Sequence, residues 1–267
     1  MSRPRPRRPA RGGSRHADRE PTAAAAGPLY GRNPVHEALV AGRRPVRRVF
    51  ATRRAVDEPW LAELGDRVRL ATAEEIEALC GSPDHQGVCA EVGPYLYADL
   101  DDLLAAPDPL LVALDEVQDP QNVGAICRTA EAAGATGVLL PERRAAPVTA
   151  AVAKASAGAV EHLPVARVRN LADALAAARK RGCWIYGADA GARTRYDRVD
   201  WRGGIVLVLG AEGRGLRPRV AAACDDLVVL PLRGRVASLN VSATAAVLLY
   251  AALQARSQPV DMRSEAP

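Results

Sequence analysis

The stretch that decides the fold is VLVLGAEGRGLRPRVAAACDDLVVLPLRGRVASLNVSATAAVLLYAAL, residues 206–253. An apolar run from Ile205 to Leu209 ends at a loop with three glycines, and this pattern predicts a buried strand. The segment Asp226 to Leu230 predicts a second buried strand. Ser238-Leu239-Asn240 is predicted to open a helix that runs to Leu253 and is too apolar for the surface. Two strand ends and one helix start therefore converge, at the kind of place where open α/β sheets bind ligands.

The rest of the C-terminal half alternates short apolar runs with helical patterns. Strands are predicted at 110–114, 138–140, 160–165 and 183–187, and helices are predicted to begin near Asp119, Pro147 and Asn170. This alternation indicates an α/β fold, a mostly parallel sheet with helices on both faces. The pattern alone predicts an ordinary unknotted topology.

The N-terminal half predicts a smaller α/β unit over residues 28–93. Its predicted strands are 46–51, 68–70 and 88–92, and Thr72 with Glu75 forms a capping box for a helix ending at Cys80. Residues 94–109, with three prolines and an acidic cluster, predict a linker. The remaining 110–267 would form the large domain.

Composition excludes several classes of protein. No apolar run reaches membrane-spanning length, and no apolar segment of the secretory type follows the basic N-terminus. The sequence has five cysteines, an odd number, and no CxxC motif. We therefore expect buried thiols in a reducing cytoplasm. The four histidines show no metal-ligand spacing, and we expect no metal site.

Three motifs in order resemble the SpoU/TrmH family of RNA ribose 2′-O-methyltransferases. They are LDEVQDPQNVGAICRTAEAAGATGVLL (114–140), LGAEGRGL (209–216) and LPLRGRVASLNVSATAA (230–246). Two further stretches, GRNPVHEAL (31–39) and HQGVCAEV (85–92), are similar to the branch that acts on large-subunit ribosomal RNA. The resemblance implies a C-terminal trefoil knot, a dimeric catalytic domain, and an RNA-binding role for the small N-terminal domain.

The excess positive charge of the chain lies in its first residues. Residues 1–27 hold seven arginines against Asp18 and Glu20, a net of +5, and the remaining residues are balanced at 29 basic and 29 acidic. Such a Pro/Arg/Gly tail is predicted to be disordered. It serves either as a solubilising leader or as a non-specific contact to phosphates, and the implied RNA substrate favours the second.

The resemblance implies catalytic roles for Asn122, Arg128, Glu212, Ser238 and Asn240. Each has a plainer alternative: Asn122 could cap its helix, Arg128 could pair with Glu131, and Glu212 could be an exposed turn carboxylate. Ser238 is a good N-cap residue, whereas Asn240 at the third position of an apolar helix is not explained by capping. In the family the arginine is assigned as the base. Because a guanidinium keeps its proton, positioning and charge stabilisation are the physically simpler role.

The cofactor implied by the resemblance is S-adenosylmethionine. Its pocket is implied to include Gly210, Leu230, Pro231, Ser238 and Leu239, mainly through backbone groups. No GxGxxG follows the first strand of the large domain, so a conventional dinucleotide site is not indicated.

These expectations combine into one function with open alternatives. The chain is expected to methylate the ribose 2′-hydroxyl of a specific nucleotide, a guanosine of 23S ribosomal RNA. The motifs equally suit a transfer-RNA guanosine or a resistance-type ribosomal adenosine. A non-catalytic RNA-binding protein is the rival class, and the three intact motifs argue against it.

Overall fold

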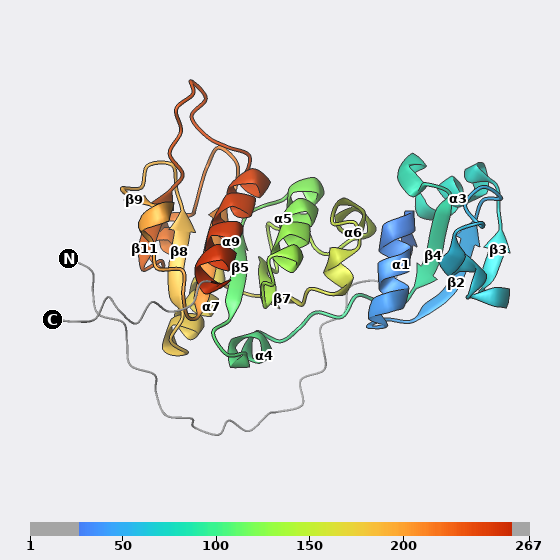
Figure 1. The fold of residues 1–267 in the computed structure, drawn as a ribbon, viewed down its shortest axis with the longest axis horizontal. Coiled ribbons are helices and arrows are strands. Elements are labelled where there is room, and N and C mark those ends of the chain that lie inside the picture. Colours follow the sequence, from blue (N-terminus) through green and yellow to red (C-terminus); the bar gives the residue numbers. More distant parts are fainter. Residues whose placement is uncertain (1–26, 258–267) are drawn as a thin grey trace.

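The computed structural model describes residues 27–257 and contains two β-sheets (Figure 1). The tail 1–26, with its predicted disorder and phosphate contacts, lies outside the described residues. So does the C-terminal segment 258–267.

The smaller sheet has four strands in the order β1-β4-β2-β3. The strands are β1 (Pro28–Tyr30), β2 (Val46–Ala51), β3 (Val68–Leu70) and β4 (Val88–Val92). The accompanying helices are α1 (Arg32–Ala41), α2 (Pro59–Ala62) and α3 (Ala73–Cys80). The capping box predicted for α3 is present, with Thr72 Oγ1 accepting from Glu75 N and Glu75 accepting from Thr72 N.

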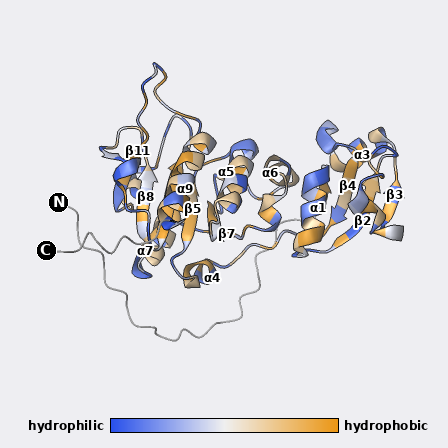
Figure 2. Ribbon diagram, viewed as in Figure 1, coloured by the Kyte–Doolittle hydropathy of each residue, from blue (hydrophilic) through white to orange (hydrophobic). Residues whose placement is uncertain are grey.

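The larger sheet has seven strands in the order β7-β6-β5-β10-β8-β11-β9, and every pairing is parallel. The strands are β5 (Leu110–Asp115), β6 (Gly137–Pro141), β7 (Val165–Val168), β8 (Trp184–Ala188), β9 (Thr194–Arg195), β10 (Ile205–Gly210) and β11 (Asp226–Val229). The central strands β5, β6 and β10 are mostly hydrophobic, as Figure 2 shows for β5, and β5 ends in Asp115. Burial on both faces explains these unbroken apolar runs.

Helices cover both faces of the larger sheet, which confirms the predicted fold class. They are α4 (Leu100–Ala105), α5 (Pro120–Ala132), α6 (Ala150–Ala155), α7 (Leu171–Lys180), α8 (Pro218–Ala221) and α9 (Val241–Ser257). Apolar side chains of α5, α6 and α9 pack on one face, and those of α4, α7 and α8 pack on the other. The trefoil knot implied by the resemblance stays a prediction.

Two predicted strands differ from the structure. The run 160–165 is not a strand: residues Ala159–Glu161 form a 3-10 turn, and β7 begins only at Val165. The turn follows Gly158, whose φ of 91° reverses the chain there. The second strand of the opening stretch, β11, buries only Val228 because it lies near the sheet edge, next to the two-residue β9.

The segment 94–109 connects the two sheets and is more ordered than an extended linker. It carries α4, whose Leu103 and Leu104 are buried in the core of the larger sheet. Tyr95 is also buried, and its hydroxyl donates to the carbonyl of Val160 at 2.9 Å.

An arginine–carboxylate pair joins the two sheets. Arg44 precedes β2, and its guanidinium binds both carboxylate oxygens of Glu161, which lies in the turn before β7. The Glu161 side chain is 1% exposed and that of Arg44 is 10% exposed. We call these two residues the inter-sheet pair.

All five cysteines are free, and Cys89, Cys127 and Cys183 are buried. Burial raises the pKa of the Cys127 thiol to about 12, so this group is inert at neutral pH. Within residues 27–257 no cluster of three metal-ligating side chains occurs, and no helix has the length and hydropathy needed to cross a bilayer.

Candidate active site

Three side chains predicted from the sequence meet at the carboxyl edge of the larger sheet. Asn240 Nδ2 donates to Glu212 Oε1 at 2.7 Å and to Asn122 Oδ1 at 2.9 Å. Asn122 Nδ2 donates to the same Glu212 oxygen at 3.2 Å. One carboxylate therefore holds two amides that are 118 residues apart in the sequence.

Asn122 is placed for this contact by the start of α5. The helix is capped by Asp119, whose carboxylate accepts from Gln121 N at 2.9 Å, so capping is not the role of Asn122. Pro120 occupies the first helical position, where its missing N–H costs nothing. Asn122 itself is buried, and its amide is satisfied by Glu212 and Asn240.

Asn240 corrects the sequence prediction for the last helix. The helix α9 begins at Val241, and Asn240 is its cap: Asn240 Oδ1 accepts from Ser242 N at 2.7 Å and from Ala243 N at 3.3 Å. The plainer alternative for Ser238, an N-cap, is not formed, because the helix begins later than its apolar pattern suggests. The Asn240 amide thus has two functions, because its oxygen caps α9 while its nitrogen donates to Asn122 and Glu212.

The loop carrying Glu212 is fixed by a buried carboxylate that sequence reasoning missed. Asp115, at the end of β5, accepts from Arg217 N at 2.8 Å and from Arg217 Nε at 2.7 Å. The Asp115 side chain is fully buried, and that of Arg217 is 39% exposed. We call these residues the loop pair. In the sequence, only one feature indicates this pair: the carboxylate of Asp115 directly follows the apolar run of a buried strand.

The loop also needs glycine at its first position. A Cβ on Gly210 would collide with the backbone of Gly215, so β10 can turn sharply only without a side chain there. This close approach and the loop pair together hold residues 211–217 against the end of β5.

Arg128 and Ser238 lie outside the hydrogen-bonded cluster. The Arg128 side chain, on the second turn of α5, is exposed and makes no ion pair or hydrogen bond with any residue in 27–257, so the alternative pairing with Glu131 is not formed. Ser238 is exposed in the segment Pro231–Asn240, every residue of which is exposed. This segment projects from the body of the molecule between β11 and α9 (Figure 1).

A cavity of about 470 Å³ lies beside the cluster. It is lined by Gly210, Leu230, Ser238 and Leu239 from the predicted set, and by Glu212. Pro231, also predicted, does not line it. The volume falls in the range of small-ligand pockets, and apolar walls with nearby backbone groups at strand ends suit a nucleoside. The residues present therefore fit S-adenosylmethionine.

Comparisons with known proteins agree with this geometry. Residues 109–250 match the SpoU rRNA Methylase family, and residues 28–98 match the family described as RNA 2′-O ribose methyltransferase substrate binding. A putative TrmH family tRNA/rRNA methyltransferase of Bacillus subtilis is 47% identical over 178 residues, covering 65% of this chain and 72% of that protein. An uncharacterised tRNA/rRNA methyltransferase of Mycobacterium tuberculosis is 38% identical over 274 residues, covering 99% of this chain and 82% of that protein.

Solved structures show the same fold. The SpoU methyltransferase AviRb of Streptomyces viridochromogenes, in complex with AdoMet, has a TM-score of 0.71 and 27% identity, covering 85% of this chain and 89% of that one. An AdoMet-bound rRNA methyltransferase of Sinorhizobium meliloti has a TM-score of 0.73 and 26% identity, covering 86% and 87%. By motif, fold and sequence, this chain belongs to the SpoU methylase family of S-adenosylmethionine-dependent RNA methyltransferases.

Proposed function

We propose that the chain methylates the ribose 2′-hydroxyl of one nucleotide in 23S ribosomal RNA, a guanosine. The observation that supports this most directly is the hydrogen-bonded cluster of Asn122, Glu212 and Asn240 beside the 470 Å³ cavity. The match of residues 28–98 to a substrate-binding family for 2′-O ribose methylation supports the choice of atom. The small unit, residues 28–93, would select the RNA, and residues 110–267 would carry the chemistry.

Residues that line the cavity would hold the cofactor. When bound, S-adenosylmethionine supplies a methyl group already activated on a sulfonium. Leu230 and Leu239 would contact the adenosine with apolar surface, and backbone groups at Gly210 would read its polar edge. Pro231 is left out of this set, because it does not line the cavity.

The remaining residues align the nucleophile. Glu212 fixes the two amides of Asn122 and Asn240, so these groups are oriented before the RNA arrives. Ser238, an exposed residue that lines the cavity, would add a hydroxyl near the ribose. Alignment is the main demand of this reaction, because the methyl group needs no further activation.

Arg128 would position the ribose and an adjacent phosphate. Its guanidinium is exposed, without a partner among the described residues, on the helix that carries Asn122. A planar cation with several donors can bind a phosphate while stabilising charge that develops on the 2′-oxygen.

Substitution of Arg128 tests this role. Arg128→Ala should abolish methylation and leave cofactor affinity nearly unchanged, because the cavity is built by other elements. Arg128→Lys should lose nearly as much activity if the planar fork is needed, and should keep measurable activity if charge alone suffices. Single-turnover rates at saturating RNA and cofactor decide between the two. An Arg128→Ala enzyme with near-normal turnover would remove Arg128 from the site.

The target nucleotide requires a separate experiment. Mapping 2′-O-methyl groups in RNA from a deletion strain and from the same strain after complementation identifies the nucleotide that depends on this enzyme. A missing methyl group on a 23S guanosine is expected. Loss of a transfer-RNA guanosine or a ribosomal adenosine methyl group would instead support the other two substrates.

The proposal includes a homodimer that acts in the cytoplasm, where the RNA is. The last helix α9 leaves Val247 and Tyr250 exposed, at 40% and 51%, and these side chains line a shallow hollow with Tyr196 and Leu253. An exposed apolar strip of this kind, on a helix whose other face packs in the core, is typical of a subunit interface. Sedimentation at micromolar concentration should give twice the monomer mass, and a monomer would contradict this part of the proposal.

A further inference from the structure

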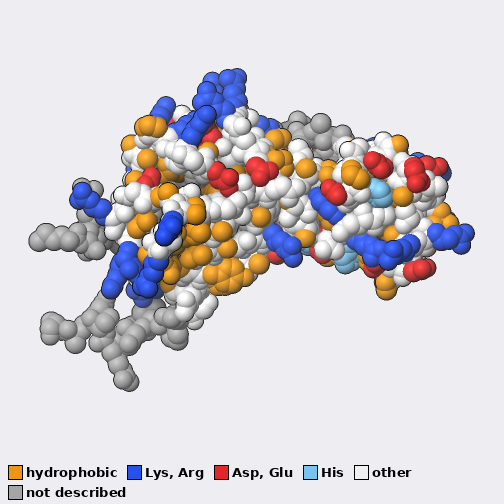
Figure 3. Space-filling model, turned by 90° about the horizontal axis from the view of Figure 1, so that it is seen from above, with side chains coloured by type: hydrophobic (Ala, Val, Ile, Leu, Met, Phe, Trp, Pro, Cys, Tyr) orange, Lys and Arg blue, Asp and Glu red, His pale blue; other side chains and the backbone are white. Residues whose placement is uncertain are grey.

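A second groove lies at the carboxyl edge of the larger sheet, away from the cofactor cavity. Its volume is about 1310 Å³, and its lining includes six arginines: Arg143, Arg144, Arg167, Arg169, Arg217 and Arg219. It also contains four carboxylates, those of Asp99, Asp102, Glu142 and Asp173, so its net charge is +2. In Figure 3, basic side chains gather at both ends of the molecule.

The arginines follow the ends of neighbouring strands. Arg167 and Arg169 lie at the end of β7, Arg143 and Arg144 follow β6, and Arg217 and Arg219 follow β10. The strand order β7-β6-β5-β10 therefore arranges them in a row. Three inter-strand spacings make this row about 14 Å long. A row of that length can face more than one phosphate of a nucleic acid strand.

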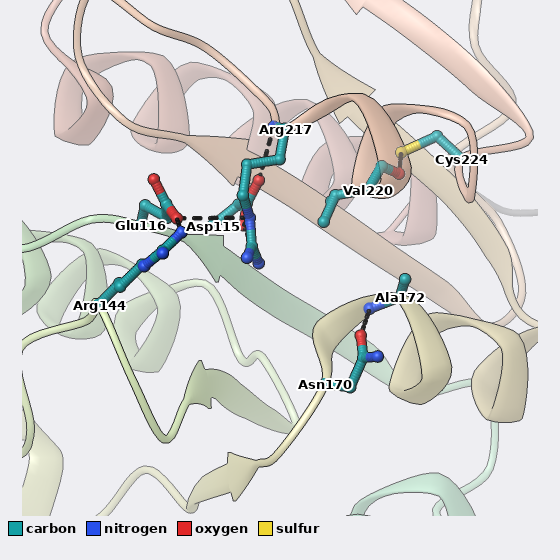
Figure 4. A network of polar contacts seen from close by, with 8 residues as sticks. All are labelled: Asp115, Glu116, Arg144, Asn170, Ala172, Arg217, Val220 and Cys224. Carbon is teal, nitrogen blue, oxygen red and sulfur yellow. Dashed lines mark hydrogen bonds and ion pairs between the residues drawn. The ribbon is translucent and has the colours of Figure 1, made fainter.

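Four of the six arginines are already engaged. Arg144 pairs with Glu116 at 3.1 Å, and Arg217 belongs to the loop pair (Figure 4). Arg219 pairs with Asp173 at 3.0 Å. Arg167 donates to the carbonyl of Glu142 at 2.6 Å and lies over the Tyr97 ring. These contacts hold the walls of the groove.

The other two arginines are available for a ligand. Arg143 and Arg169 are exposed, and neither makes an ion pair or hydrogen bond within the described part of the chain. The start of α7 lies between them and the Arg219 side of the groove, and its helix dipole adds partial positive charge. The groove thus presents unpaired positive charge on a fixed frame, which suits an anionic ligand.

We propose that this groove binds the phosphate backbone of the substrate RNA, with Arg143 and Arg169 as its direct contacts. The inference rests on the proposed function and adds a binding site to it. One end of the groove lies at the carboxyl end of β7, the edge strand of the larger sheet. The other end lies at Arg217, five residues after Glu212. RNA in the groove would therefore run from the β7 edge of the larger sheet toward the catalytic cluster.

The test compares two double variants of the full-length protein. Arg143→Ala/Arg169→Ala removes the two direct contacts, and both side chains are exposed, so the fold should be kept. Lys180→Ala/Arg181→Ala removes two positive charges from the opposite end of α7 and serves as the matched control. Among the described residues, the control variant loses one ion pair, the 3.6 Å contact between Arg181 and Asp101.

The probe is deproteinised 23S ribosomal RNA from a strain lacking the enzyme. The groove variant should bind it about tenfold more weakly, and the slope of log K against log salt should become shallower by about 1.4, for two phosphate contacts on a single strand. Affinity for S-adenosylmethionine should match that of the wild type, because neither arginine lines the cofactor cavity. The apparent second-order rate constant of methylation at low RNA should fall about as far as the RNA affinity. The control variant should match the wild type in every measurement.

Several outcomes would overturn the inference. Wild-type affinity and salt slope in the groove variant would contradict it, and so would an equal loss in the control variant. A thermal-shift arm with inorganic pyrophosphate distinguishes a small ligand: if the groove variant loses pyrophosphate binding but keeps RNA binding, the site serves a small phosphorylated molecule. If the wild type itself neither binds nor methylates RNA, the proposed function fails as well, and this is visible without any variant.

Discussion

Within the part of the chain that the structure describes, two carboxylates are buried with an arginine, and they connect different parts of the molecule. In the loop pair, Asp115 at the end of a strand binds Arg217 and fixes the loop that carries Glu212. In the inter-sheet pair, Glu161 binds Arg44 and joins the small unit to the larger sheet. Both carboxylates are at most 1% exposed, yet Arg217 is 39% exposed and Arg44 only 10%.

The difference indicates which property each pair controls. The inter-sheet pair is sealed from solvent, so breaking it leaves a buried charge and should reduce stability. The loop pair lies next to the candidate catalytic residues and includes a hydrogen bond to a backbone N–H. Breaking it should therefore shift Glu212 and slow methylation, in addition to reducing stability. The two pairs can be separated experimentally.

The largest effect is expected from Glu161→Gln. The substitution leaves the Arg44 cation buried without a counter-charge, and breaking a buried pair costs about 3–5 kcal/mol. Urea denaturation should show a loss of that size in the free energy of unfolding. Glu77→Gln, on the exposed side of α3, is the control and should change stability by less than about 0.5 kcal/mol. A Glu161→Gln protein as stable as the wild type would show that the pair contributes nothing.

Asp115→Asn should affect turnover where Glu161→Gln does not. Loss of the charge loosens the 211–217 loop and shifts Glu212, and a misplacement of about 1 Å can cost roughly 100-fold in rate. Single-turnover methylation, measured at a temperature where both variants are folded, gives the comparison. An unchanged rate in Asp115→Asn would mean that Glu212 is positioned without the loop pair.

Apolar replacement of both partners sharpens the contrast. Arg44→Met/Glu161→Leu removes both charges together and should recover stability to within about 2 kcal/mol of the wild type. Asp115→Leu/Arg217→Met should stay less stable by about 1–3 kcal/mol, because the backbone N–H of Arg217 loses its acceptor. Equal recovery in both double variants would contradict the proposed role of that backbone bond.

The smallest effect is expected from Arg43→Met, beside the inter-sheet pair. Nη1 of Arg43 is buried without a hydrogen-bond partner among the described residues, so removing it costs no bond. The free energy of unfolding should change by about 1 kcal/mol or less, in either direction. Arg44→Met, one residue along, leaves Glu161 unpaired and should lose about 3–5 kcal/mol. Thermal denaturation of the two variants side by side provides the measurement.

The sequence by itself determined the order of elements and the candidates for chemistry. Unbroken apolar runs identified β10 and β5 up to Leu114, because a strand buried on both faces carries mostly apolar side chains. Local signals located the capping box at Thr72 and the Asn170 cap of α7, because both depend on residues within three positions. The motifs alone were enough to identify Asn122, Glu212 and Asn240 as candidates, because each motif is a short continuous stretch of sequence.

Only the tertiary structure decided which groups are partners. Asp115 and Arg217 are 102 residues apart, and Arg44 and Glu161 are 117 apart. Contacts at such separations depend on strand order and on how the two sheets meet, and no local pattern encodes either. The same reason explains the errors. Asn240 looked like a residue inside the last helix, because its role as the cap depends on where α9 starts. The run 160–165 looked like a strand because its apolar residues are buried, and the 3-10 turn at its start contacts α1 of the small unit.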